Sequence, residues 1–203
     1  MSETSTACVL FPRSGPSNTA RTLELSRARA DTLGIRKILV ATTTGATGIR
    51  AVQELDGLDV IVVTHSTGFQ EPDTQELTAE NRAAIEAAGA GVLTCQHALG
   101  GVGRAVRKKL GTYQLDEIIA YTLRTFCQGI KVGAEIALMA ADAGLVRTAE
   151  PLIAIAGTGR GADTAVVIKP TNAQTFFDLR FLEIICMPSP EHPECRDQGS
   201  VAP

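Results

Sequence analysis

The chain is poor in aromatic residues. It has no tryptophan, and its two tyrosines and six phenylalanines make up 4% of the 203 residues. Proteins that stack nucleic-acid bases need aromatic platforms, and proteins that bind the phosphate backbone need a basic face. The formal net charge here is −3. We therefore expect no nucleic-acid partner.

Paired cysteine motifs and targeting segments are also missing. The five cysteines are an odd number without a C-x-x-C pair, so we expect neither a disulfide framework nor a zinc site. Residues 1–6 are polar and do not form a signal peptide. The longest apolar stretch, 129–146, contains Lys131, Glu135 and Asp142, too many charges for a membrane span. These absences predict a cytoplasmic chain with free thiols, no metal and no membrane contact.

The length and composition favour one globular domain. Hydrophobic residues make up 44% and charged residues 20%, which is typical of a soluble fold. No internal repeat or linker divides the sequence, and a (β/α)8 barrel needs about 250 residues. We predict a single domain over 9–188 with flexible termini at 1–8 and 189–203, since 188–203 holds four of the nine prolines.

Short apolar runs alternate with segments of helical period. Runs typical of buried strands lie at 37–42, 58–64, 91–95, 152–156, 163–168 and 181–186. Helices are expected at 19–33, from the loop at 43–48 to about Leu55, at 74–88, and at 115–143. Asn18 and Gly34 are suited to cap the first of these helices. The alternation predicts an α/β fold, a three-layer α/β/α sandwich with a mostly parallel sheet.

Open α/β sheets bind ligands beyond the carboxyl ends of their strands, so the loops there are candidate sites. The segment Ala41–Gly48 contains four threonines and two glycines between a strand and a helix. A glycine bend, hydroxyl groups and the free N–H groups of a helix start suit an oxyanion. No Walker lysine follows. The alternative is a well-capped turn without a ligand, and we favour anion binding.

A second glycine-rich loop, Gly157–Asp163, matches G-x-G-x-x-A after a predicted strand. It leads into another strand instead of a helix, so we reject dinucleotide binding. Arg160 in this loop is able to pair with a phosphate or a carboxylate. A solvated turn is an equally good interpretation of the loop taken alone.

Two of the three histidines, His65 and His97, each follow a predicted strand. Both are therefore expected at the same sheet edge, where two histidines favour a site over ordinary surface residues. We recognise no acidic residue that would orient either ring, and no serine-nucleophile motif. Four basic residues behind a short glycine motif are interpreted as solvated; they are Arg104, Arg107, Lys108 and Lys109.

Several separated motifs, in this order, resemble a known family. They are Gly15–Thr19, Thr42–Gly45, Thr64-His65 with Gly68-Phe69, His97–Gly100, Glu135–Gly144, Gly157–Asp163 and Phe176–Asp178. From Phe11 to Pro188 the chain is similar to small stand-alone microbial proteins built on the pyruvate kinase C-terminal (alpha/beta) domain, which lack the catalytic barrel. Ser17 and Gly48 depart from the family pattern, which has an acidic residue and alanine there.

The resemblance implies a sheet of order 3-2-1-4-5 with an extra edge strand. It also implies bound flavin mononucleotide (FMN) without a settled reaction. Thr43–Thr47 would hold the phosphate with help from Arg160, and Phe69 or Phe126 would cover the flavin ring. The implied cofactor-binding residues are Asn18, Thr42, Thr43, Thr44, Gly45, Ala46, Thr47, His65, Gly68, Phe69, His97, Gly159, Arg160, Gly161 and Asp163.

Two functions follow from this resemblance. The first is a soluble FMN-binding protein without pyruvate kinase activity. A flavin-dependent oxidoreductase is one form that such a protein would take. The second is a regulatory module that senses a phosphorylated metabolite, and a third interpretation is an assembly protein with a vestigial site. Self-association is expected only by analogy with the family. If the loop binds phosphate, FMN binds more tightly than riboflavin, and Gly45→Val abolishes binding without unfolding the chain.

Overall fold

Seven strands form one sheet in the computed structural model, which describes residues 3–189. The strands are β1 (Val9–Phe11), β2 (Lys37–Ala41), β3 (Asp59–Val63), β4 (Gly91–Leu93), β5 (Leu152–Ala156), β6 (Thr164–Lys169) and β7 (Arg180–Pro188). Their order across the sheet is β1-β7-β6-β5-β2-β3-β4. β2 therefore lies inside the sheet, between β3 and β5.

The sheet is mostly parallel, as the sequence predicts. β2 runs parallel to both β3 and β5, and β3 runs parallel to β4. β6 is antiparallel to β5 and to β7. The order differs from the expected one in one detail: β1, which was not predicted, pairs with β7 and takes the edge position expected for 181–186.

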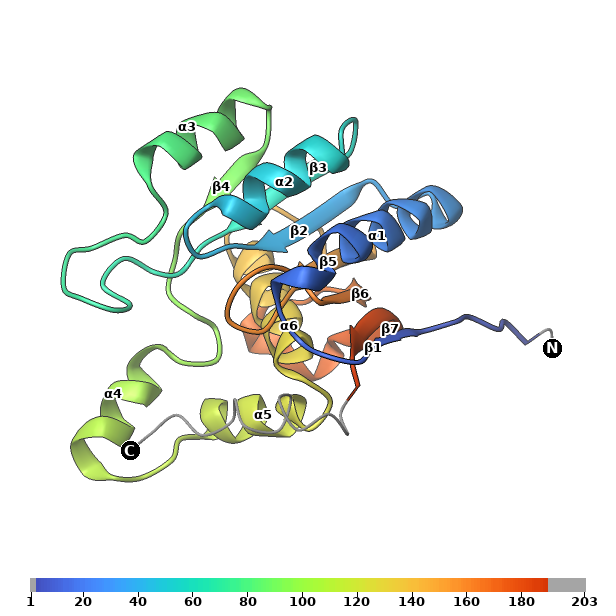
Figure 1. Ribbon diagram of the computed structural model, residues 1–203. Helices are drawn as coiled ribbons and strands as arrows, with labels where there is room; N and C mark the ends of the chain where they lie inside the picture. Colours follow the sequence, from blue (N-terminus) through green and yellow to red (C-terminus); the bar gives the residue numbers. More distant parts are fainter. Residues whose placement is uncertain (1–2, 190–203) are drawn as a thin grey trace.

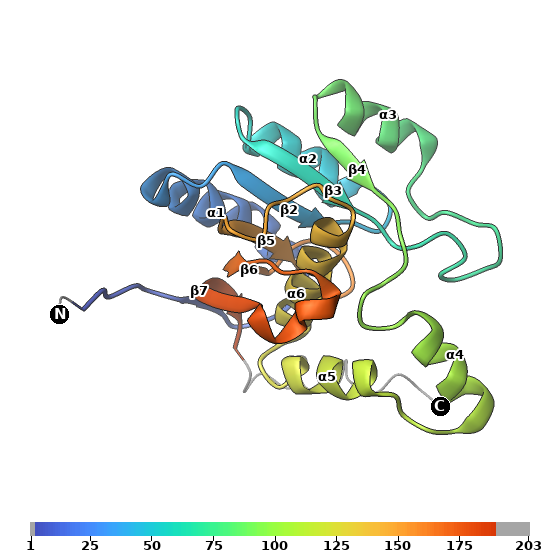
Figure 2. The same ribbon diagram turned by 180° about the vertical axis from the view of Figure 1, so that it is seen from behind.

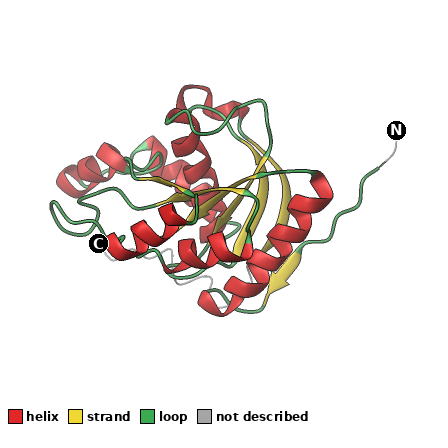
Figure 3. Cartoon of the chain, turned by 90° about the horizontal axis from the view of Figure 1, so that it is seen from above, coloured by secondary structure: helices red, strands yellow, loops and turns green. Residues whose placement is uncertain are grey.

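Helices cover both faces of the sheet. They are α1 (Thr19–Leu33), α2 (Ala46–Glu54), α3 (Ala79–Ala87), α4 (Gly101–Leu110), α5 (Leu115–Arg124) and α6 (Gln128–Asp142), with short 3-10 turns η1 (Pro16–Asn18) and η2 (Ala173–Asp178). α1, α2 and α3 lie on one face and α6 on the other (Figures 1 and 2). Seen from above, the strands lie between the two helical layers (Figure 3). The predicted three-layer sandwich is the fold of the protein.

β2 contributes to two separate cores. Ile38 and Val40 pack with α1, α2 and α3, whereas Leu39 packs with α6. Because both faces of the strand are covered, its sequence is apolar without the alternation of a half-exposed strand. This is why the run at 37–42 could be read as a buried strand.

α6 is the most buried helix: twelve of its fifteen residues are buried. Small residues bring it close to the sheet, because a Cβ atom at Gly129 would lie only 2.0 Å from the Thr164 hydroxyl oxygen. Lys131 and Glu135 are buried on this helix, one turn apart. The two charges neutralise each other, as buried charges require.

The helix boundaries correct two predictions. The helix expected at 115–143 is interrupted at Cys127, whose backbone is extended, and becomes α5 and α6. The helix expected at 74–88 begins only after Thr78, whose hydroxyl oxygen accepts a hydrogen bond from the Asn81 N–H group. Residues 74–78 are therefore loop, which leaves Glu76 available to the site described below.

The start of α1 and the basic segment after residue 100 also differ from expectation. Asn18 precedes α1 and Gly34 ends it in a left-handed conformation, as predicted. The Asn18 side chain does not cap the helix, however, because it donates to the Arg13 carbonyl oxygen (2.7 Å). The basic segment forms α4, a helix that was not predicted.

Within residues 3–189, no helix has both the length and the apolar character needed to cross a membrane. The chain from residue 3 to residue 8 has no regular structure. The predicted flexible tail lies, from residue 190 onward, outside the described residues.

Candidate functional site

Four loops meet at one edge of the sheet. β2, β3, β4 and β5 are parallel, so the loops that follow them leave from the same edge. Strand order reverses between β2 and β5, and such a switch point is where open α/β sheets bind ligands. The loop after β2 therefore lies between the loop after β5 and the loop after β3.

The loop Thr42–Thr47 connects β2 to α2 through Gly45, which has a φ of 105°. The Thr42 hydroxyl oxygen accepts a hydrogen bond from the Gly45 N–H group (3.2 Å), which tightens the bend. Other polar groups of the loop have no hydrogen-bond partner among residues 3–189: the hydroxyl groups of Thr43, Thr44 and Thr47 and the N–H groups of Ala46 and Thr47. The loop thus offers several donors at the positive end of a helix dipole.

Gly45 has a packing role that the sequence did not reveal. A Cβ atom here would lie 2.5 Å from the Asn81 Cβ atom and 2.7 Å from Leu77 Cδ1. The Asn81 side chain also donates to the Thr44 carbonyl oxygen (2.7 Å). The expectation for Gly45→Val is therefore corrected: the new side chain would collide with the α3 region, so lost binding would not be separable from altered folding.

Asp163 is fully buried, and both of its carboxylate oxygens accept hydrogen bonds from the protein. Oδ2 accepts from the N–H groups of Gly15 (2.8 Å) and Thr158 (3.2 Å), and Oδ1 accepts from the Thr164 hydroxyl group (2.8 Å). The side chain fastens the glycine-rich loop to the segment before α1. The predicted contact between Asp163 and a cofactor is corrected to this supporting role.

The rest of the Gly157–Asp163 loop packs against the same segment. A Cβ atom at Gly161 would lie 2.4 Å from the Pro16 Cα atom, and the Ala162 N–H group donates to the Thr19 hydroxyl oxygen (3.0 Å). Gly159 and Arg160 remain exposed. Arg160 forms no ion pair with any residue from 3 to 189, and it is the cation on the loop beside Thr42–Thr47.

One strand further along the edge, three predicted site residues form an aromatic cluster. The ring centroids of His65 and Phe69 are 4.1 Å apart, and those of Phe69 and His97 are 4.8 Å apart with the rings nearly parallel. The guanidinium carbon of Arg104, on α4, lies 4.9 Å from the Phe69 centroid. The interpretation of Arg104 as merely solvated is corrected, because it forms part of this cluster. Gly68 lies in the same loop as Phe69.

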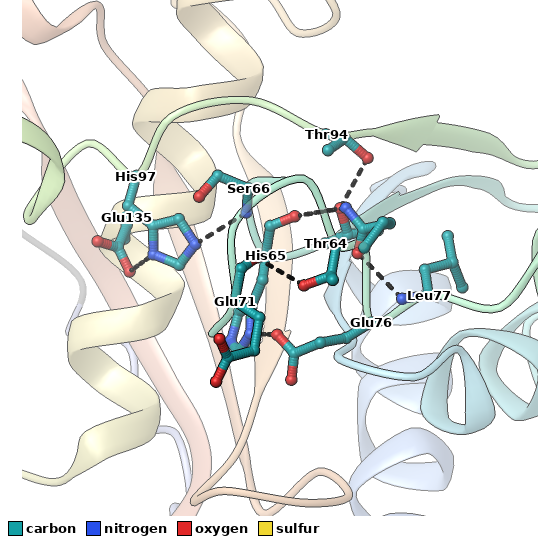
Figure 4. A network of polar contacts seen from close by, with 11 residues as sticks. Thr64, His65, Ser66, Glu71, Glu76, Leu77, Thr94, His97 and Glu135 are labelled. Carbon is teal, nitrogen blue, oxygen red and sulfur yellow. Dashed lines mark hydrogen bonds and ion pairs between the residues drawn. The ribbon is translucent and has the colours of Figure 1, made fainter. Parts of the chain in front are cut away.

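Both histidines have a carboxylate partner, contrary to the interpretation of the sequence (Figure 4). The Nδ1 atom of His65 lies 2.6 Å from a carboxylate oxygen of Glu76. The Nδ1 atom of His97 lies 3.7 Å from a carboxylate oxygen of Glu135. Glu76 belongs to the loop that was predicted as helix, and Glu135 comes from α6, so no local spacing would have revealed either partner.

His97 is a neutral ring in a fixed orientation. Burial lowers its pKa to about 4, even though the Glu135 charge acts in the opposite direction. Its Nε2 atom accepts a hydrogen bond from the Ser66 N–H group (3.4 Å), which assigns the ring proton to Nδ1 on the Glu135 side. At neutral pH, His97 therefore presents an uncharged aromatic face.

Glu135 supports His97 from beneath. Its side chain forms an ion pair with Lys131, and the two side chains are only 3% and 4% exposed. Burial alone would raise the pKa of Glu135, but the charge of Lys131, with hydrogen bonds from Lys131 and the Leu99 N–H group, holds it below its ordinary value. Glu135 is thus a carboxylate that holds the loop after β4 on α6.

A cavity of about 220 Å³ lies between the aromatic cluster and α4. One side is lined by Ser66, Gly68 and Phe69 and the other by Gln96, Arg104 and Lys108. Phe126, the alternative cover for a flavin ring, is 51% exposed between α5 and α6 and does not line this cavity.

The structure thus arranges the predicted site residues in two neighbouring groups. Thr42–Thr47 lies beside the loop that holds Gly159, Arg160 and Gly161, and His65, Phe69 and His97 form the cluster at the ends of β3 and β4. The Thr42 N–H group donates to the Val63 carbonyl oxygen (2.9 Å), which joins the ends of β2 and β3. Asn18 lies near the first group, and its side chain donates a hydrogen bond to the Arg13 carbonyl oxygen.

One solved structure with a similar segment is that of a mutant of O-ureido-L-serine synthase with O-ureido-L-serine bound. The similarity covers 67% of this chain and 49% of that chain, with 16% sequence identity and a TM-score of 0.29. The chain therefore spans about half the length of that enzyme.

A family model gives the identification. The model described as pyruvate kinase, alpha/beta domain, matches residues 20–168, which is well over half of the chain. The matched segment runs from α1 to the end of β6 and includes all four loops of the sheet edge. The chain belongs to the family of the pyruvate kinase alpha/beta domain.

Proposed function

We propose that the chain binds a small phosphorylated ligand of the FMN type, with its phosphate on the Thr42–Thr47 loop. The observation that carries this proposal is the set of free hydroxyl and N–H donors at the start of α2, next to the switch point of the sheet. Hydrogen bonds to a charged group contribute about 1.5–3 kcal/mol each. The exposed charge of Arg160 on the adjacent loop supports the same ligand.

The threonines of the phosphate loop and the aromatic cluster beside it together suit FMN. Thr43, Thr44 and Thr47 would hold the phosphate, and the rings of His65 and Phe69, one strand further along the edge, would contact the flavin. Bound FMN would supply hydride or electron transfer. His97 would lie beside the flavin as an uncharged ring, because burial keeps it neutral at physiological pH.

Membership of the pyruvate kinase alpha/beta domain family favours a second candidate, a regulatory module that senses a phosphorylated metabolite. We do not propose pyruvate kinase catalysis for this chain, because the described fold is the alpha/beta domain alone. An oxidoreductase would also need an electron donor, and the sequence has no recognisable nicotinamide site.

Calorimetric titration with FMN and riboflavin tests the phosphate assignment. We expect FMN to bind more tightly by about 2–4 kcal/mol, which corresponds to roughly 30- to 1,000-fold in affinity. Thr47→Val removes one donor at nearly constant volume and should weaken FMN binding about tenfold. Thr148→Val, at an exposed position outside the site, is the matched control.

The outcomes separate the candidates. Equal affinities for FMN and riboflavin would contradict the phosphate assignment. A colourless protein that sugar phosphates stabilise against heat, while FMN does not, would favour the regulatory module.

A further inference from the structure

The basic residues of α4 lie in two different environments. Arg107 faces α5, where its Nε atom lies 2.7 Å from a carboxylate oxygen of Glu117. Arg104 and Lys108, one helical turn apart, line the cavity beside Phe69. Within residues 3–189, neither of them forms an ion pair or a side-chain hydrogen bond.

Two unpaired cations on one face of a helix are unfavourable on their own. Like charges four residues apart repel each other by about 0.2–0.5 kcal/mol. The acidic residues of α5 do not relieve this repulsion, because Glu117 pairs with Arg107, and Asp116 lies against Gly103 and forms no ion pair with Arg104 or Lys108. An anion between Arg104 and Lys108 would remove the repulsion and form charge-assisted hydrogen bonds with both.

The surroundings of the cavity add further positive charge. Lys131 is buried beneath His97 and is already paired with Glu135. Burial lowers the pKa of Arg124, and the nearby charge of Arg104 acts in the same direction. Glu135, the buried carboxylate of this region, is thus surrounded by more positive charge than it neutralises.

We propose that this cavity binds the anionic group, a carboxylate or a phosphate, of a small organic substrate through Arg104 and Lys108. Phe69 and the neutral His97 provide apolar faces for the body of the molecule, and Gln96 and Ser66 add polar neighbours. The cavity is partly open to solvent, and its volume of about 220 Å³ is below the roughly 300–1,000 Å³ of pockets for drug-sized ligands, which suits the anionic end of a small metabolite. The proposal goes beyond the phosphate loop at 42–47 and does not depend on FMN.

Amide NMR spectra of the full chain, titrated with malonate or with inorganic phosphate, test the proposal. Gly68, Phe69 and Gly101 report on the cavity, and the amides of 43–47 report on the phosphate loop. We expect saturable shifts at the cavity reporters. Shifts with malonate identify the substrate as a carboxylate, and shifts with phosphate at these same reporters identify it as a phosphate ester.

Variants on α4 provide the second part of the test. Arg104→Gln and Lys108→Ala should each weaken binding at the cavity reporters about tenfold or more, without changing the behaviour of 43–47. Lys109→Ala, an exposed change on the same helix, should bind as the wild type does. No residue of α4 is buried, so all three variants should retain the wild-type melting temperature.

The proposal is overturned if neither probe gives saturable shifts at Gly68, Phe69 and Gly101. It is also overturned if Lys109→Ala loses as much affinity as Arg104→Gln. Because the phosphate loop has its own reporters and FMN has its own titration, failure of this proposal is distinguishable from failure of the proposed function.

Discussion

The two halves of the sheet edge are built differently. Beside β5, the loop 157–163 is fastened to the segment before α1 by the buried carboxylate of Asp163 and by the close approach of Gly161 to Pro16. Beside β4, the loops lead to α4, which has no buried residue. The first half is therefore held more firmly by buried contacts than the second.

Each half depends on one buried carboxylate, but in different ways. Asp163 accepts hydrogen bonds from Thr158 and Thr164 beside it in the chain and from Gly15 in the segment before α1. Glu135 acts across layers, because it reaches from α6 to the Leu99 N–H group and toward His97. Loss of Asp163 should therefore damage folding first, whereas changes near His97 should be more visible in ligand binding and pH dependence.

The largest expected effect is that of Asp163→Ala. It leaves the N–H groups of Gly15 and Thr158 without their acceptor inside the protein, and we expect the free energy of unfolding to fall by about 4 kcal/mol. Urea unfolding measures this change. Asp163→Asn, which retains one acceptor oxygen, should lose less, and the exposed Asp178→Ala is the control. Similar stability of Asp163→Ala and Asp178→Ala would remove the distinction between the two halves.

Lys131→Met tests the support beneath His97. Removing one member of a buried ion pair leaves the other charge unpaired, which costs about 3–4 kcal/mol. The double variant Lys131→Met/Glu135→Leu should recover most of this loss, because no charge is then buried. Thermal or urea unfolding of the two variants checks the prediction, and equal destabilisation by the single and the double change would contradict it.

His97 makes stability depend on pH. Its pKa in the folded protein is about 4, below the ordinary value of 6.5, so the unfolded chain takes up a proton first as the pH falls. The free energy of unfolding should therefore decrease, by up to about 3 kcal/mol, from pH 6.5 to pH 4. Glu135, whose folded pKa is lowered, adds a further loss below about pH 4.3.

Urea unfolding over this pH range, with His97→Phe as the variant, isolates the histidine contribution. The variant should show a flatter pH dependence than the wild type, and Thr148→Ala should follow the wild-type curve. A slope that is unchanged in His97→Phe would show that the ring is protonated as easily in the folded protein as in the unfolded chain.

Gly45→Ala should have a smaller effect. Its φ of 105° is unfavourable for a residue with a side chain, and the added methyl group would approach Asn81 and Leu77. We expect a loss of about 1–3 kcal/mol in the free energy of unfolding. Gly57→Ala, also at positive φ but with open space around it, separates the backbone strain from the collision. Equal losses at the two positions would mean that the contact with α3 contributes nothing.

Glu76→Gln is expected to have the smallest effect on stability. The His65–Glu76 pair is partly exposed, and such pairs contribute at most about 1 kcal/mol. The variant retains a hydrogen-bonding oxygen but loses the charge, so FMN titration of this variant tests whether the orientation of His65 matters for the ligand. A stability loss as large as that of Lys131→Met would contradict the partly open character of this half.

The sequence predicted those parts of the fold whose physical cause is local. β2 and β5 are apolar because both of their faces are covered, and Gly34 ends α1 at the predicted residue. β1 escaped prediction because three residues carry little pattern, and the strand exists only through pairing with β7. α4 escaped it because glycines at 100, 101 and 103 obscure the helical signal.

The candidate site was predictable at the level of loops but not of contacts. Two strand ends followed by histidines indicated a shared edge, and parallel pairing brings them together. Glu135 approaches His97 only through packing of α6, and Glu76 was assigned to a helix that begins later. The four-residue spacing of Arg104 and Lys108 was visible in the sequence, but the cavity that gives it meaning arises from tertiary structure.

α4 has no buried residue, and Val102 and Leu110 are largely exposed. It meets the rest of the protein through a few side chains, such as Arg104 on Phe69 and Arg107 on Glu117. A segment held in this way is exchangeable: grafting the corresponding helix from another family member should transfer its preference among metabolites without disturbing the sandwich. Natural variation in this helix would then diversify recognition while the sheet beneath it stays unchanged.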